Sequence, residues 1–296
     1  MQLSQGVGIL SGRIAMPRQA ILSSESDLDE FLRRLSSSHI STICIEGRCP
    51  NRGLCFPHRH ISVLILGDVC TRNCRFCSVK KGAKGGDFSW EEEAICSLVR
   101  EADIRSLVIT SVTRDDLPDY GAGHFTRIVR SLKDEFPYLK IELLIPDFMA
   151  QTRLLDLILE LPVEIIGHNI ETVKRLYPVI RPNSDFDRSL SVISYLSKHS
   201  PTSVRIKTSF MLGLGEKLED ARQLIQTLAQ TGVEELCIGQ YLSPGEGHFK
   251  VSQIYDKIDF EELAGYARSL GVKRVMAGPF VRSSFSIEEG RNGVKE

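Results

Sequence analysis

The sequence of 296 residues predicts an α/β fold, a partial (β/α)6 TIM-like barrel with N- and C-terminal extensions. Three observations carry this prediction. Short runs rich in Ile, Val and Leu, without strict alternation, are typical of parallel strands that are covered on both faces. These runs alternate with helical patterns, which indicates βαβ units. Polar motifs also follow the strands directly, where α/β barrels hold their active sites.

The predicted elements form six strand–helix units. The strands are residues 61–68, 105–112, 140–147, 163–169, 203–212 and 235–242. The helices are residues 89–102, 122–136, 151–161, 185–198, 217–230 and 259–270. Ser89 and the three glutamates after it are a typical N-cap and first turn. Three regions result, with residues 1–60 and 273–296 as extensions that pack on a barrel of residues 61–272.

Composition excludes several classes of protein. Lys and Arg number 37 and Asp and Glu 38, so the net charge is -1 and the basic excess of a nucleic-acid binder is missing. No apolar run approaches the ~20 residues of a membrane helix. The first residues lack a secretory apolar core and are poor in arginine for a transit peptide. We therefore expect a cytoplasmic enzyme that binds neither nucleic acid nor membrane.

Six of the eight cysteines lie within residues 44–77, at ligand spacing rather than spread as in a disulfide scaffold. They form two triplets, Cys44-x4-Cys49-x5-Cys55 and Cys70-x3-Cys74-x2-Cys77. Each triplet is one ligand short of the four that a structural zinc ion or a four-iron cluster takes. A structural zinc site is one interpretation. A four-iron cluster with one open iron that binds a small molecule is the other.

The second triplet, "CTRNCRFC", follows the first predicted strand and resembles the radical S-adenosylmethionine superfamily. That resemblance implies that Cys70, Cys74 and Cys77 hold a [4Fe-4S] cluster. It also implies that the open iron binds S-adenosylmethionine, and that one electron cleaves the sulfonium to give a 5′-deoxyadenosyl radical.

A longer series of motifs resembles the lipoyl synthase family over residues 44–288. It runs "CPN", "LILGDVCTRNCRFC", "VITSVTRDDLPD", "GAGHF", "IELLIPDF", "HNIETVKRLYP", "SFMLGLGE", "GQYLSP" and "GPFVRSSF". The resemblance implies a second, auxiliary [4Fe-4S] cluster on Cys44, Cys49 and Cys55, with Ser284 as its fourth ligand. A hard serine oxygen suits iron poorly beside soft thiolates, so that bond is expected to be labile.

The activity implied by this resemblance is insertion of two sulfur atoms, from the auxiliary cluster, at carbons 6 and 8 of a protein-bound octanoyl group. The implied partners are an octanoylated lipoyl carrier protein or domain, an electron donor and an iron–sulfur carrier for cluster repair. The carrier would be a 2-oxoacid dehydrogenase acyltransferase subunit or a glycine-cleavage H protein.

Two alternatives remain open. One is a divergent radical enzyme that inserts sulfur into another substrate. The other is a zinc-stabilised binding module without catalysis. His58 and His60 could supply further zinc ligands to such a module, although a full set of clusters already accounts for the six cysteines.

The motif "HNIET" follows the fourth predicted strand. Asn169 and Glu171 could bind the methionine or ribose of S-adenosylmethionine, or cap the next helix, and the resemblance favours the first. Lys207 lies in an otherwise apolar strand, where it either reaches solvent at a strand end or points into the cavity. The resemblance favours the cavity.

The motif "LGLGE" is similar to a dinucleotide fingerprint, but Leu218 stands at the place of the third glycine, so we do not expect NAD binding. We expect Gly213, Gly215 and Glu216 to form a loop that lets the backbone approach S-adenosylmethionine.

Other polar and sulfur-bearing residues have plainer interpretations. Arg114, Asp115 and Asp116 form either a polar clamp or a solvated turn, and the sequence does not decide between them. Cys96 on a helix and Cys237 in a strand are expected to be core residues.

The chain departs from the usual family pattern at four positions. Phe285 replaces a tyrosine and Tyr120 a glycine, while Thr208 and Ser209 stand for serine and glycine. These departures leave the cysteine triplets intact and bear on the acyl substrate.

Overall fold

The computed structural model describes residues 9–10, 13–14, 25–56, 59–82 and 85–284. Its centre is a parallel sheet of seven strands in the order β11-β10-β9-β8-β7-β6-β3. The strands are β3 (Ile61–Ile65), β6 (Ser106–Ser111), β7 (Lys140–Leu144), β8 (Ile165–Gly167), β9 (Arg205–Leu212), β10 (Glu235–Gln240) and β11 (Arg274–Gly278). Neighbouring strands are parallel throughout, so helices must connect them.

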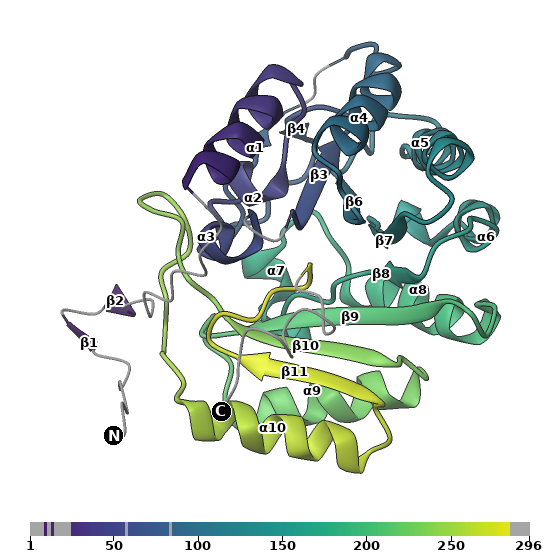
Figure 1. Cartoon of the computed structure of the whole chain (residues 1–296). Helices are drawn as coiled ribbons and strands as arrows, with labels where there is room; N and C mark the ends of the chain where they lie inside the picture. The colour runs from purple at the N-terminus through teal and green to yellow at the C-terminus, as the bar shows by residue number, and fades with distance from the viewer. Residues whose placement is uncertain (1–8, 11–12, 15–24, 57–58, 83–84, 285–296) are drawn as a thin grey trace, which may run out of the picture.

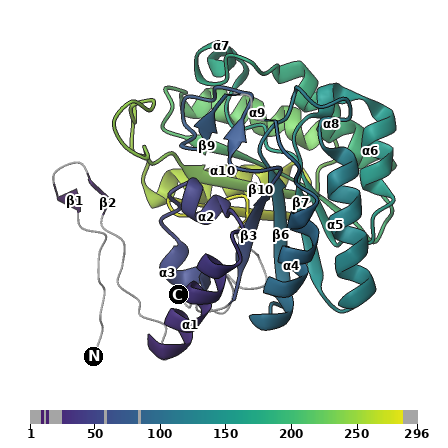
Figure 2. The same cartoon turned by 90° about the horizontal axis from the view of Figure 1, so that it is seen from above.

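Each predicted strand is followed by its predicted helix. The helices are α4 (Trp90–Glu101), α5 (Ala122–Glu135), α6 (Thr152–Leu159), α8 (Phe186–His199), α9 (Leu218–Gln230) and α10 (Lys257–Ser269). They lie along the outer side of the curved sheet (Figures 1 and 2). Every residue of β3 and β10 is buried, as expected of strands covered on both faces. The partial (β/α)6 barrel is therefore confirmed.

The starts of α8 and α4 are stabilised in different ways. Asp185 caps α8 by accepting a hydrogen bond from the backbone of Arg188. Ser89 occupies the N-cap of α4, as predicted, but its side chain makes no capping bond. Glu91 in the first turn is buried, and its carboxylate instead accepts hydrogen bonds from backbone amides in the loop after β3. Glu91 at the start of α4 therefore fixes the backbone of Leu66 and Gly67, just before the segment that carries the second cysteine triplet.

A seventh strand comes from the segment that the sequence placed outside the repeating units. Residues Arg274–Gly278 of β11 pair in parallel with β10, with Met276 opposite Cys237. This strand lies at the edge of the sheet and is only partly buried. Its apolar run is accordingly short, which is why the sequence did not reveal it. The C-terminal extension thus contributes a strand before it continues as residues 279–284.

The open side of the partial barrel, between β3 and β11, is occupied by segments from both extensions (Figure 1). From the N-terminal extension come α1 (Glu25–Ser37), α2 (Ile43–Glu46) and α3 (Arg52–Cys55). Thr42 pairs with Val63 of β3. Asn51 donates a side-chain hydrogen bond to the carbonyl of Phe280 at 2.7 Å. Segments from opposite ends of the chain therefore meet at this seam.

Smaller elements complete the described part. They are the antiparallel pair β1 (Ile9–Leu10) and β2 (Arg13–Ile14), the parallel pair β4 (Val69–Cys70) and β5 (Lys80–Lys81), the short helix α7 (Tyr177–Ile180), and the 3-10 turns at Phe148–Ala150 and Lys174–Leu176. Among the described residues, no helix combines the length and apolar character needed to cross a membrane.

A buried ion pair lies inside the barrel. The Lys207 amine on β9 contacts both carboxylate oxygens of Glu142 on β7, at 2.8 and 3.0 Å. Burial opposes the charge on the amine, but Glu142 outweighs it, so the pKa of Lys207 stays above its ordinary value. Cys96 and Cys237 are both buried, as expected of core residues. Burial raises the pKa of the Cys237 thiol to about 11, so this thiol stays protonated at neutral pH.

Candidate active site

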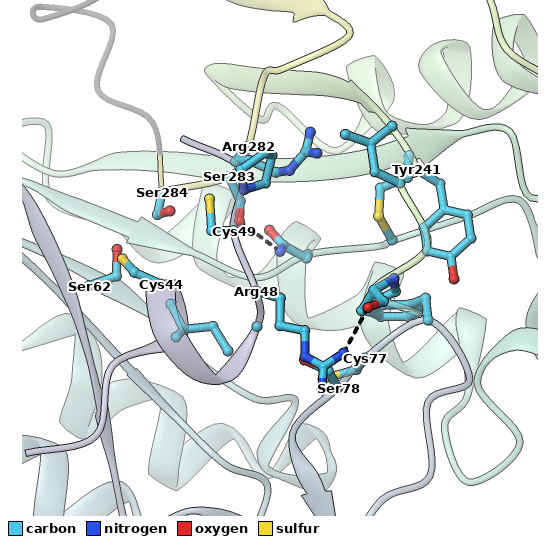
Figure 3. A pocket seen from close by; sticks show the side chains of 18 of the residues that line it. Cys44, Arg48, Cys49, Ser62, Cys77, Ser78, Tyr241, Arg282, Ser283 and Ser284 are labelled. Carbon is cyan, nitrogen blue, oxygen red and sulfur yellow. Dashed lines mark hydrogen bonds between the residues drawn. The ribbon is translucent and has the colours of Figure 1, made fainter. Parts of the chain in front are cut away.

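A cavity of about 500 Å³ opens inside the barrel (Figure 3). Residues from the N-terminal extension, the cysteine loop, the barrel strands, the loop after β10 and the C-terminal tail all line it. Its aliphatic lining includes Ile43, Val108, Leu144, Met211 and Leu242. The cavity thus combines an apolar interior with the residues that the sequence singled out as ligands.

Two residues of the first triplet and the predicted serine ligand line this cavity. They are Cys44, Cys49 and Ser284, which Figure 3 shows on one side of it with Ser62 beside Cys44. Cys44 lies on α2, and Cys49 follows by donating its amide to the Cys44 carbonyl at 3.0 Å. Burial raises the pKa of Cys44, and hydrogen bonds from Ser62 partly offset this effect. The fold therefore gathers donors from both ends of the chain.

Cys55, the third residue of this triplet, ends α3 and is half-buried, but it is not among the residues that line the cavity. Its amide donates to the carbonyl of Asn51 at 2.9 Å, and its own carbonyl accepts from the amide of His60. Cys55 is thus fixed to the same segment as the side chains that hold the C-terminal tail.

Three side chains from separate elements clasp that tail. Asn51 binds the Phe280 carbonyl, and His60 Nε2 lies 2.7 Å from the Ser284 carbonyl oxygen. Asn169 donates to the Ser283 hydroxyl at 3.1 Å. His60, which the sequence offered as a possible zinc ligand, therefore contacts the tail, while His58 lies outside the described residues. The clasp fixes the backbone on both sides of the Ser284 hydroxyl.

The second triplet begins with Cys70 at the end of β4 and continues on the loop before β5. All three cysteines are half-buried, and of them Cys77 lines the cavity, whereas Cys70 and Cys74 do not. The Cys70 carbonyl accepts from the Gly82 amide at 2.9 Å, and the Cys77 amide donates to the Cys74 carbonyl at 3.2 Å. These bonds close the loop on itself, so its three thiols are carried by one compact turn.

Arg72, inside the second triplet, anchors this loop to the barrel. Its guanidinium makes bidentate contacts with Asp115, both at 2.9 Å, and with Asp147, at 2.7 and 2.6 Å. Arg188 also donates to Asp147 at 2.8 Å. These charges hold the pKa of Asp147 well below its usual range, although burial alone would raise it. Asp115 is therefore part of a clamp, whereas Arg114 pairs with Asp116 of its own turn and lies over the Phe88 ring at 5.2 Å.

A smaller cavity of about 130 Å³ adjoins the first, and Asn169 and Glu171 line both. Around it, Asn169 Oδ1 and His168 Nε2 are buried without a hydrogen-bond partner in the described part of the chain. Burial lowers the pKa of His168 to about 4, and its Nδ1 lies 2.9 Å from the Ile145 carbonyl. The proton of the neutral ring therefore lies on Nδ1, and Nε2 presents a lone pair. Both atoms can accept a hydrogen bond from a polar ligand in this cavity.

Glu171 is held beside β9 by backbone hydrogen bonds of 2.9 Å to Ser209 and Met211. Burial raises its pKa, and the charge of Arg181 opposes that rise. The alternative role of Asn169 and Glu171 as helix caps is wrong. The N-cap position of the next helical turn is Val173, and no side chain makes a capping hydrogen bond there.

Lys207 and the "LGLGE" loop lie elsewhere. Lys207 is held by Glu142 and lines neither cavity. The Glu216 carboxylate accepts from the amides of Gly213 and Leu214, at 2.5 and 3.0 Å, so the loop wraps around its own side chain. Gly213 has φ +99°, and a Cβ there would lie 2.2 Å from Gln240 Nε2. The glycine is therefore needed for packing within the protein, and we do not retain these residues in the site.

Within the described residues, no group of three His, Cys, Asp or Glu side chains is placed to hold a single metal ion. A tetrahedral zinc ion binds thiolates at about 2.3 Å, so its ligands must converge closely. The described part of the chain therefore contains no preformed zinc site.

Comparisons with known proteins agree with this geometry. The family model of the Radical SAM superfamily matches residues 64–228, more than half of the chain. Lipoyl synthase of Caldicellulosiruptor saccharolyticus is 39% identical over 268 residues, which are 90% of this chain and 94% of that protein. Lipoyl synthase of Aquifex aeolicus is 38% identical over 264 residues, 89% of this chain and 95% of that protein. The chain belongs to the lipoyl synthase family.

Solved structures place the lipoyl synthase chain in a wider fold group. Streptococcus suis SuiB bound to precursor peptide SuiA aligns with a TM-score of 0.57 at 12% identity, covering 90% of this chain and 58% of that chain. Methylornithine synthase (PylB) aligns with a TM-score of 0.51 at 15% identity, covering 86% and 79%. At such identities these likenesses show the fold alone.

Departures from the lipoyl synthase pattern have visible consequences. Tyr120, at a usual glycine, has φ +52°, the left-handed region that glycine occupies without steric cost. Its hydroxyl accepts a hydrogen bond from Gln151 at 3.3 Å. Thr208 donates its hydroxyl to the His168 carbonyl at 2.8 Å, and Ser209 is buried. Phe285 lies outside the described residues.

Proposed function

We propose that this chain inserts two sulfur atoms, at carbons 6 and 8, into an octanoyl group carried on a lysine of a lipoyl carrier protein or domain. Membership of the lipoyl synthase family makes it a radical S-adenosylmethionine enzyme with iron–sulfur chemistry. The observation that carries the proposal is the shared cavity. Cys77 of the second triplet, the first-triplet residues Cys44 and Cys49, and Ser284 all line one space with aliphatic walls.

The residues present fit two [4Fe-4S] clusters. Cys70, Cys74 and Cys77 would hold one, and Cys44, Cys49, Cys55 and Ser284 the other. Thiolates are the usual donors to such clusters, and here all six cysteines of the triplets are free of disulfides. When bound, the cluster on Cys70, Cys74 and Cys77 would supply a hydrogen-abstracting radical together with S-adenosylmethionine. The cluster on the first triplet and Ser284 would supply sulfide.

The chain's own residues then serve three tasks. Ile43, Leu144 and Met211 offer an apolar wall that an eight-carbon acyl chain can cover while water is excluded. Asn169 and Glu171, together with His168 at the smaller cavity, present polar atoms to S-adenosylmethionine. The protein thus supplies position and a dry environment, as is general for cofactor enzymes.

Further parts of the proposal concern partners and setting. The carrier is an acyltransferase subunit of a 2-oxoacid dehydrogenase or a glycine-cleavage H protein. An electron donor and an iron–sulfur carrier complete the cycle, because each turnover consumes electrons and sulfide. A cytoplasmic setting suits free thiols in a reducing compartment. The extension of residues 1–60 carries the first triplet, residues 61–272 form the barrel, and residues 273–296 carry the serine ligand.

The test compares three proteins that are reconstituted anaerobically. Wild type is expected to bind about eight irons and to convert an octanoyl-lysine peptide, as mass spectrometry will show, into a dithiol with two more sulfurs and the same number of hydrogens; oxidation to the cyclic disulfide would then remove two hydrogens. The variant with Cys70, Cys74 and Cys77 changed to Ala is expected to hold about half the iron and to lose 5′-deoxyadenosine formation.

The variant with Cys44, Cys49 and Cys55 changed to Ala is also expected to hold about half the iron. It should still form 5′-deoxyadenosine, but it should add no sulfur to the peptide. Thiolated peptide from this variant would refute the sulfur-donor role of the first triplet.

A further inference from the structure

The mouth of the large cavity is framed by three loops, which we call the rim: residues 46–50, 75–82 and 241–250. Residues from each loop line the cavity. Hydrogen bonds join the loops in pairs. Arg48 Nη1 donates to the Pro244 carbonyl at 2.9 Å, the Phe249 amide donates to the Arg75 carbonyl at 2.9 Å, and the Ser78 hydroxyl donates to the Glu46 carbonyl. The rim is therefore a connected ring around the entrance.

The charge of the rim differs from that of the whole chain. It contains five lysines and arginines against two glutamates, a net charge of +3, whereas the chain as a whole carries -1. Four of these cations are exposed and have no carboxylate partner in the described part of the chain: Arg48, Arg75, Lys81 and Lys250. The fifth, Lys80, pairs with Asp68.

The unpaired cations come from all three loops. Arg48 reaches from its own loop to the Pro244 carbonyl of another, and Arg75 lies over the ring of Phe249, the residue before Lys250, at 5.4 Å. Elsewhere on the surface many cations are paired with carboxylates, for example Lys174 with Asp187 and Lys273 with Glu234. Cations left unpaired around one entrance complement an anionic partner.

We propose that the rim is the docking surface for the carrier protein, and that it recognises an acidic surface around the octanoylated lysine. This inference rests on the proposed function, because the octanoyl group must enter the cavity while it is still attached to its carrier. The apolar interior accepts the acyl chain, and the cations meet the protein surface that remains outside. Exposed charges of this kind mainly govern association and its salt dependence.

The first measurement needs no variant. The KM of wild type for an octanoylated carrier domain is expected to rise several-fold between low and physiological ionic strength, because salt screens exposed charges. The KM for an uncharged octanoyl-lysine tripeptide, which has no carrier surface, should stay constant. A carrier KM that is indifferent to salt would overturn the proposal.

Two variants then locate the effect. Lys250→Ala and Lys250→Glu are both expected to raise the carrier KM, and the charge reversal is expected to raise it about threefold to tenfold. The tripeptide KM and the iron content should be unchanged. Arg130→Glu, an exposed arginine on α5, is the matched control and should leave both KM values as they are.

The outcomes separate this inference from the proposed function. If neither rim variant changes the carrier KM more than Arg130→Glu does, the rim is not the docking surface, even if sulfur insertion proceeds. If neither the tripeptide nor the octanoylated domain gains sulfur with wild type, the proposed function fails. In that case a binding measurement decides about the rim. If the octanoylated domain shows no salt-dependent binding to the protein, the rim is overturned as a carrier site.

Discussion

The clamp between Arg72 and its two aspartates allows a quantitative test through the substitution Asp147→Asn. The Asp147 side chain is fully buried, and its carboxylate binds Arg72 and Arg188. The amide keeps the shape of the side chain but removes its charge, which leaves Arg72 buried with Asp115 as its remaining counter-ion. Breaking one partner of a buried ion pair costs about 3–5 kcal/mol. Because Asp115 remains, we expect the lower end, about 3 kcal/mol.

The assay is urea unfolding of the metal-free protein under reducing conditions, together with iron content after reconstitution. A loss of about 3 kcal/mol corresponds to a fall in melting temperature of roughly 5 °C for a chain of 296 residues, at about 2.1 cal/mol/K of unfolding entropy per residue. The matched control is Asp187→Asn. Asp187 pairs with Lys174, and the side chains of both are about two-thirds exposed, so we expect a loss of at most about 1 kcal/mol.

The same clamp predicts a pH dependence. The pKa of Asp147 is depressed in the folded protein, so its contribution to stability is complete above the unfolded carboxyl value of about 3.9 and is lost as pH falls toward the folded value. Wild type should therefore lose more stability than Asp147→Asn as the pH falls below about 4. Equal losses for Asp147→Asn and Asp187→Asn at neutral pH would refute the reasoning.

Three further predictions concern cysteines, a glycine and the serine ligand. Cys96→Ser and Cys237→Ser should retain full iron and lose about 1–3 kcal/mol in urea unfolding, because each puts a hydroxyl in the core; loss of one cluster's iron would make either cysteine a ligand. Gly213→Ala should cost about 2 kcal/mol, because its φ is +99° and a Cβ would meet a side-chain amide and a backbone carbonyl. Gly265→Ala, in a helix with open space around it, should instead gain about 0.5–1 kcal/mol, and equal effects would contradict this account. Ser284→Ala should still form 5′-deoxyadenosine while adding less sulfur to the peptide, and unchanged sulfur transfer by mass spectrometry would count against the ligand role.

The barrel was predictable because its signal is local. A parallel strand such as β10 is buried along its whole length and carries an apolar run between Glu235 and Gln240, and the helix after it has its own cap. The edge strand β11 is half-exposed, so its short run resembled an extension rather than a strand. The sequence pattern thus indicated how deeply a strand is buried. It did not indicate that a partly exposed strand such as β11 also belongs to the sheet.

The site was only partly predictable because many of its contacts are distant in sequence. The triplet spacing identified the cysteines, but the partners of Arg72 lie 43 and 75 residues away. Nothing in the local pattern distinguished this arginine, although the aspartates that bind it also follow strands. For Lys207 the sequence posed a choice between solvent and the cavity, and the structure supplied a third answer, a buried partner on β7.

The seam between the two chain ends has a consequence for how the protein is made. Asn51 and Phe280 are 229 residues apart. At about 5–20 residues per second, the ribosome needs roughly ten to fifty seconds to synthesise the segment between them. During that interval the first cysteine triplet has been synthesised, but the tail that lines the same cavity does not yet exist. The second triplet needs no such wait, because Arg72 meets both of its aspartates within the next 75 residues. A nascent chain therefore acquires the anchor of its second cysteine loop early, and the complete lining of the large cavity only when synthesis is nearly finished.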